Sequence, residues 1–166
     1  METRPRIKIE LSQTDKLIEF LGWLTLLLLV GLTLYSYSNL PDTIPIHFNG
    51  SGQVDNYGSK STIISLPVIG TVLFIGLTML NKYPHIFNYP VNITADNAFK
   101  QYTTATRIIR CLKFSIALIF TSIVFMTYTT ATGKTSGLGT WFLPLTLGLI
   151  FIPQTFLLFK SFKAKK

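Results

Sequence analysis

The sequence predicts an all-α integral membrane protein with four transmembrane helices, a short hairpin-like loop and an amphipathic helix. Two observations support this fold class. Of the 166 residues, 48% are hydrophobic and only 13% are charged, and the mean hydropathy is +0.43; soluble domains carry about 25% charged residues. Four apolar segments are also long enough to cross a bilayer, which takes about 20 mainly apolar residues. We expect a single membrane domain over residues 1–166.

The predicted spans cover residues 17–37, 63–80, 111–131 and 138–159. None has an ionisable residue in its middle, so a carrier that moves protons through buried carboxylates is disfavoured. The first span is longer than the apolar core of a signal peptide, and no small-residue cleavage site follows it. We therefore expect it to be retained. Pro67, Pro144 and Pro153 are expected to kink their helices.

The distribution of basic residues predicts the orientation of the spans. Thirteen of the 15 Lys and Arg residues lie in the N-terminal arm, around the loop after the second span, or in the C-terminal tail, whereas the other two loops hold only Lys60 and Lys134. Positive residues concentrate on the cytoplasmic side. We expect both termini in the cytoplasm of a multi-pass plasma-membrane protein. The net charge of +8 then indicates contact with anionic lipids at the cytoplasmic face, rather than with nucleic acid.

Residues 40–60, LPDTIPIHFNGSGQVDNYGSK, form the outer loop in this arrangement. Ile44, Ile46 and Phe48 alternate with other residues at the period of a strand. The NGSG that follows is a turn signal, so we expect a hairpin-like structure over residues 44–57. With a turn at residues 50–52, Phe48 lies opposite Val54, and the hairpin is expected to rest its apolar face on the helix ends or on the lipid interface.

The same register places His47 opposite Asp55, within reach of a hydrogen bond. The candidate ligand-binding residues of the outer loop are His47, Asn49, Asp55 and Lys60. Two interpretations remain open. Either His47 and Asp55 only brace the hairpin, or they recognise a peptide, a lipid headgroup or a metal ion outside the cell. His47 and Asp55 are the only candidate metal ligands, and a closed zinc site usually has four. No cofactor is predicted.

The loop after the second span is expected to contain a cytoplasmic amphipathic helix over residues 95–110. Thr94 is a suitable N-cap. Ala98, Tyr102, Ala105 and Ile109 recur at helical spacing, while Lys100 and Arg107 are expected to face the other way. This helix is interpreted either as a membrane-surface helix or as a docking face for a cytoplasmic protein partner. In both cases Tyr102 should be buried and Lys100 exposed.

Two blocks of the sequence resemble a known family. The outer loop resembles the LPxxIPxHFxxxGxxDxYxxK signature of a bacterial membrane domain of unknown function, which also occurs at the N-terminal end of SdpI-type immunity proteins. The matching positions are Leu40, Pro41, Ile44, Pro45, His47, Phe48, Gly52, Asp55 and Lys60. A second block resembles the segment after the next span of that family, through Asn88, Pro90, Thr94, Asn97, Tyr102 and Arg107. The resemblance implies a bacterial plasma-membrane protein.

The favoured interpretation is a non-enzymatic protein of the immunity or sensing type, in which the 40–60 loop recognises an extracytoplasmic peptide or lipid ligand. The alternative is a membrane-embedded enzyme or lipid-handling protein that uses His47 and Asp55 as an acid–base or metal pair. A metal or phospholipid held between the two side chains would favour the alternative.

Overall fold

The computed structural model describes residues 4–163, in which helices dominate and two strands form a small antiparallel sheet. The long helices are α1 (Gln13–Asn39), α2 (Ser65–Leu80), α3 (Ala95–Ala131) and α4 (Phe142–Lys163). The strands β1 (Thr43–Phe48) and β2 (Val54–Ser59) follow α1, and two short 3-10 helices, η1 (Lys60–Ile64) and η2 (Pro84–Ile86), flank α2. By length and composition, four helical segments of the described chain are able to cross a membrane.

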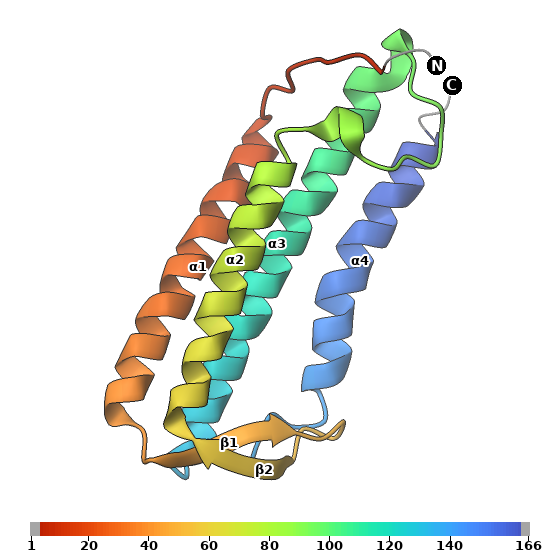
Figure 1. Ribbon diagram of the computed structural model, residues 1–166. Coiled ribbons are helices and arrows are strands. Elements are labelled where there is room, and N and C mark those ends of the chain that lie inside the picture. Colours follow the sequence, from red (N-terminus) through yellow and green to blue (C-terminus); the bar gives the residue numbers. More distant parts are fainter. Residues whose placement is uncertain (1–3, 164–166) are drawn as a thin grey trace.

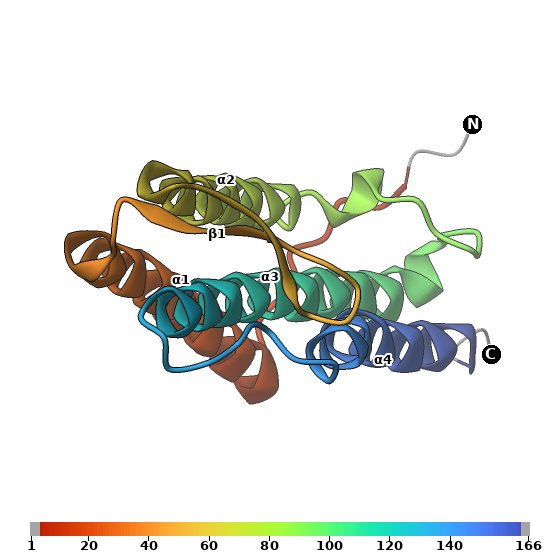
Figure 2. The ribbon, with the colours of Figure 1, turned by 90° about the horizontal axis from the view of Figure 1, so that it is seen from below.

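Helix α3 is the centre of the bundle, since it packs against α1, α2 and α4 (Figure 1). Seen along the bundle, α4 lies beside α3 on the side away from α2 (Figure 2). The hairpin of β1 and β2 crosses one end of the bundle, and the described chain ends lie at the opposite end with the loop between α2 and α3 (Figure 1). The two ends of the bundle are therefore built from different segments of the chain.

The two segments predicted separately at 95–110 and 111–131 are one continuous helix, α3. No glycine or proline interrupts residues 95–131, and Asn97 Oδ1 accepts a hydrogen bond from the backbone N–H of Thr94, at the start of the helix, at 3.0 Å. At 1.5 Å per residue this helix is about 56 Å long, far more than the roughly 30 Å of bilayer hydrocarbon. Its first part must therefore project beyond any membrane that its second part crosses.

Two details of the predicted spans are wrong. Helix α4 begins at Phe142 instead of residue 138, because Gly137 and Gly139 have positive φ angles and keep the preceding chain irregular. Pro67 and Pro144 lie in the first turns of α2 and α4, where a proline removes no helical hydrogen bond. Pro153 alone of the three lies in a helix interior.

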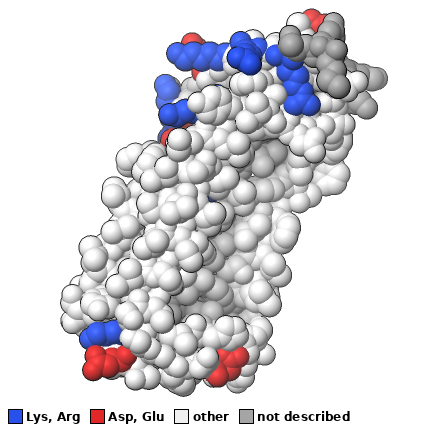
Figure 3. All heavy atoms as spheres, in the orientation of Figure 1, with Lys and Arg blue, Asp and Glu red and all other residues white. Residues whose placement is uncertain are grey.

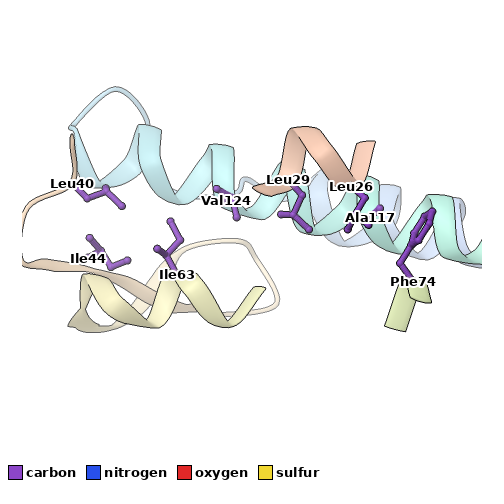
Figure 4. Packing of buried hydrophobic residues seen from close by; sticks show 8 residues of the cluster. All are labelled: Leu26, Leu29, Leu40, Ile44, Ile63, Phe74, Ala117 and Val124. Atoms are coloured by element: carbon purple, nitrogen blue, oxygen red, sulfur yellow. The ribbon is translucent and has the colours of Figure 1, made fainter. Parts of the chain in front are cut away.

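The core runs along the inner faces of α1, α2 and α3 and continues under the hairpin (Figure 4). Its buried members are Leu26, Leu29, Leu40, Ile44, Ile63, Phe74, Ala117 and Val124. The outer faces of the helices also expose large apolar side chains, among them Leu27, Leu34, Val72 and Ile152. Figure 3 shows Lys, Arg, Asp and Glu almost entirely at the two ends of the visible face, with a broad and nearly uncharged band between them.

Candidate functional site

The hairpin follows the predicted turn but departs from the predicted register. Phe48 pairs with Val54 as expected, and the backbone N–H of Asn49 donates to Gln53 O at 2.9 Å, which closes a turn over residues 50–52. His47, however, pairs with Asn56 instead of Asp55. The ladder is irregular on either side of His47, where Ile46 on one strand and Asp55 on the other have no partner.

These irregularities also break the expected apolar alternation. Pro45 is buried and Ile46 is 41% exposed, whereas Ile44 is 1% exposed. An extra residue in one strand kinks that strand and turns the following side chains. The predicted alternation, in which Ile44 and Ile46 share one apolar face, is therefore wrong for Ile46.

His47 and Asp55 nevertheless meet, as predicted. The distance from His47 Nδ1 to Asp55 Oδ1 is 2.6 Å, and the two side chains are 67% and 40% exposed. With the carboxylate as acceptor, Nδ1 carries a proton and Nε2 remains the outward nitrogen of the ring. The pair is thus an oriented imidazole on an open surface, with one nitrogen able to contact a ligand.

A hollow that we call the hairpin groove lies beside His47. Its volume is about 310 Å³, and β1, η1, α2, α3 and the loop before α4 contribute to it. Its walls are mainly apolar, with hydroxyl groups among them, and comprise Ile44, Pro45, Ile46, His47, Phe48, Thr62, Ile63, Ser65, Leu66, Ile123, Thr127 and Leu138. The groove therefore combines a mainly apolar surface with a few hydroxyl groups and the oriented imidazole of His47.

The tip of the hairpin is fixed to the loop between α3 and α4. The backbone N–H of Leu138 donates to Gly52 O at 2.7 Å, and Gln53 forms a β-bridge with Gly137. Gly52 has φ +74°, and a Cβ atom built there would lie 2.4 Å from Gly139 O. The close approach and the left-handed backbone both require glycine. The expectation that the hairpin leans on the rest of the molecule is confirmed.

Asn49 and Lys60, the other two candidate residues of the outer loop, do not join His47 and Asp55. Asn49 Oδ1 accepts hydrogen bonds from the backbone N–H groups of Ser51 at 2.9 Å and Gln53 at 3.0 Å, so its side chain shapes the turn. Lys60 follows the end of β2 that pairs with Thr43. It forms an ion pair with Asp42 at 3.1 Å.

At the opposite end of the bundle, α1 and α3 share a group of charged residues that the sequence analysis missed. This inner charge cluster comprises Asp15, Glu19, Arg107, Arg110 and Lys113. Arg107 donates from Nε to Asp15 Oδ1 at 2.7 Å and from Nη2 to Asp15 Oδ2 at 3.0 Å. Lys113 donates to Glu19 Oε1 at 2.5 Å and to Thr78 Oγ1 at 2.7 Å, and its ammonium lies 4.3 Å from the centre of the Phe74 ring.

Arg107 was expected to point away from the bundle, and this is wrong because Asp15 binds it. A signal was present in the sequence. Asp15 and Glu19 are four residues apart, and Arg107, Arg110 and Lys113 are three apart, so each set lies on one helical face. Neither set predicts by itself that the two faces meet.

The other residues of the second block hold the inner loop together. Tyr102 is buried and donates to Pro5 O at 3.1 Å, and Lys100 is exposed; both are as predicted.

Asn97 binds Asn92 O and the start of α3. Asn88 and Pro90 line an apolar cavity of about 400 Å³ beside α3 and α4. Tyr89, whose pKa burial raises above its ordinary value, donates to Pro84 O at 2.9 Å.

Within residues 4–163, no group of three or more His, Cys, Asp and Glu side chains is close enough to hold a metal ion. His47 and Asp55 are two ligand residues in this part of the chain, whereas a structural zinc site usually has four.

Comparison with known proteins places the hairpin inside a recognised segment. Residues 24–71 match a family model described as "Domain of unknown function (DUF1648)". They include most of α1, the whole hairpin and the start of α2. An uncharacterized protein of Archaeoglobus fulgidus is 32% identical over 88 residues, and the match covers 48% of each chain. The chain thus spans about half the length of this relative. No solved structure matches.

Proposed function

We propose that this protein is a non-enzymatic, multi-pass protein of the plasma membrane whose hairpin recognises an extracytoplasmic ligand. One observation carries the proposal: an imidazole oriented by a carboxylate stands at an apolar groove on the exposed end of the bundle. The matched family segment supports it, since residues 24–71 contain both side chains and much of the groove.

The membrane orientation rests on the charges at the two ends. Of the Lys and Arg residues that the structure describes, only Lys60 and Lys134 belong to the hairpin end, and the others belong to the end with the N-terminal arm and the loop between α2 and α3. By the positive-inside tendency, the hairpin faces the outside and the termini face the cytoplasm. The nearly uncharged band of Figure 3 then lies in the bilayer, and the basic end contacts anionic lipids.

The groove favours an amphiphilic ligand, such as a peptide or a lipid. An apolar part of the ligand fits against Ile44, Ile63 and Leu66, and a polar group meets the free nitrogen of His47. Such recognition agrees with a sensing or immunity role, in which binding on the outside is the protein's task. The apolar cavity beside Asn88 and Pro90 is the candidate place for a cytoplasmic protein partner.

The alternative function is membrane-embedded catalysis or lipid handling, and the carboxylate–imidazole pair is the observation that favours it. That arrangement fixes the tautomer of a general base. A catalytic role predicts chemical turnover of a bound lipid, whereas recognition predicts that the ligand is recovered unchanged.

Photo-crosslinking in intact cells tests the proposal. A photoreactive amino acid replaces Ile46, which is exposed and lines the groove; in a control it replaces Thr43, which is exposed at the far end of the same strand. We expect an adduct from position 46 that is lost when His47→Ala is added, and no such adduct from position 43. Identical adducts from both positions, or an adduct from position 46 that is insensitive to His47→Ala, contradict recognition by the hairpin.

A further inference from the structure

The inner charge cluster holds one cation more than its carboxylates neutralise. Asp15 binds Arg107 through both oxygens, and Glu19 binds Lys113 at 2.5 Å. Arg110 is left with longer contacts, 4.0 Å from Nη1 to Asp15 and 3.5 Å from Nε to Glu19. It is nevertheless only 7% exposed. Burying a cation without close partners costs folding free energy. An additional negative charge near Arg110 would therefore stabilise the structure.

Arg110 lines a cavity of about 350 Å³ that we call the basic cavity. The N-terminal arm, the segment that ends α2 and the middle of α3 enclose it, with the lining residues Ile7, Lys8, Ile9, Asn81, Lys82, Pro84 and Arg110. Among these described lining residues, three are cationic and none is acidic. This volume is in the range of small-molecule sites.

Two buried polar atoms of the lining residues have no hydrogen-bond partner among the described residues. One is Arg110 Nε, a donor, and the other is Asn81 Oδ1, an acceptor. The orientation of the Asn81 amide is fixed, because its Nδ2 donates to Thr106 O at 3.0 Å. Buried polar groups in folded proteins almost always have partners. Both atoms belong to side chains that line the basic cavity, so a ligand with an anionic acceptor and a hydroxyl donor complements the polar side chains of its wall.

We propose that the basic cavity binds a phosphate group that carries a hydroxyl, as in the glycerol phosphate headgroup of an anionic phospholipid. Arg110 donates to the phosphate oxygens, Lys8 and Lys82 add charge at the mouth, and Asn81 accepts from the hydroxyl. The guanidinium matches phosphate oxygens in geometry and charge. Arg110 directly precedes the predicted 111–131 span, a depth at which lipid phosphates lie in the proposed orientation. Free glycerol phosphate offers the same chemistry.

Native mass spectrometry of the full-length protein tests this site, with phosphatidylglycerol, phosphatidylcholine and free glycerol 3-phosphate as probes in separate arms. We expect retention of phosphatidylglycerol in preference to phosphatidylcholine. Each of Lys8→Gln and Lys82→Gln should weaken that retention about fivefold, since a basic residue near an anionic surface contributes about that factor. Retention of glycerol 3-phosphate with the same sensitivity assigns the site to the free compound as well.

Lys100→Gln is the matched control, because Lys100 is an exposed lysine at the same end of the bundle and does not line the cavity. Arg110→Lys keeps the charge and removes the Nε donor, and it should lower retention further than either lysine variant. Two results overturn the proposal: equal retention of both phospholipids together with no retention of glycerol 3-phosphate, or equal effects of Lys8→Gln, Lys82→Gln and Lys100→Gln.

Discussion

Replacing Asp15 by alanine should destabilise the protein severely. Asp15 is 1% exposed. It accepts two hydrogen bonds from Arg107, at 2.7 and 3.0 Å, and one from the hydroxyl of Ser12 at 2.5 Å. Its removal leaves Arg107 without its ion pair and removes one of the two carboxylates that balance Arg110. Breaking a buried ion pair on one side costs about 3–5 kcal/mol. Loss of the Ser12–Asp15 capping box at the start of α1 adds to this cost.

The assay is the free energy of unfolding in detergent micelles, from denaturant titration followed by helical circular dichroism. Asp42→Ala is the matched control. Asp42 likewise forms an ion pair, with Lys60 at 3.1 Å, but its side chain is 97% exposed. Exposed pairs contribute little to stability, so this variant should unfold almost as the wild type does. A second variant, Asp15→Ala with Arg107→Ala, should recover part of the loss because it removes the unpaired cation. Equal effects of Asp15→Ala and Asp42→Ala would show that burial of the ion pair does not determine its contribution to stability.

Three further predictions concern the hairpin end and are measured by thermal unfolding. Gly52→Ala should lower the melting temperature, because a side chain there meets Gly139 O and the backbone has a positive φ. Gly50→Ala should not, because the space around Gly50 is open. Equal melting temperatures of the two variants would contradict the contact between the hairpin tip and the loop before α4. Ile44→Ala should cost about 2–5 kcal/mol and Ile46→Ala much less, since Ile44 is buried and Ile46 exposed; a larger effect at Ile46 contradicts the observed register. His47→Ala should leave the melting temperature nearly unchanged, because its contact with Asp55 lies on an exposed surface; a large drop indicates that the pair only braces the hairpin.

Local signals in the sequence predicted the turn of the hairpin, but they did not predict the register of its two strands. Residues 50–52 turn as the NGSG pattern indicates, because Asn49 and a positive-φ glycine build the turn from neighbouring atoms. The offset between His47 and Asp55 was not predicted, and neither were the burial of Pro45 and the β-bridge between Gln53 and Gly137. Contacts between distant segments cannot be predicted from a two-residue alternation, because that pattern reports only on the strand itself.

At the inner end too, local features were predictable from the sequence and contacts between distant segments were not. The N-terminus of α3 was predictable from Thr94, and the burial of Tyr102 from helical spacing. The inner charge cluster was not, because Asp15 and Arg107 are 92 positions apart in sequence. Apolar spacing identified one face of α3, while its polar face packs against α1.

In the proposed orientation, the hairpin with His47 and Asp55 lies outside the cell and the chain termini lie inside. Cysteine accessibility in intact cells tests it directly, in a chain whose native Cys111 is replaced by serine. Single cysteines replace Ser51, in the turn of the hairpin, or Asn92, in the loop before α3, and both positions are exposed. A membrane-impermeant maleimide should label the cysteine at position 51 in intact cells and the one at position 92 only after the cells are broken. Labelling of position 92 in intact cells, with protection of position 51, would contradict the account.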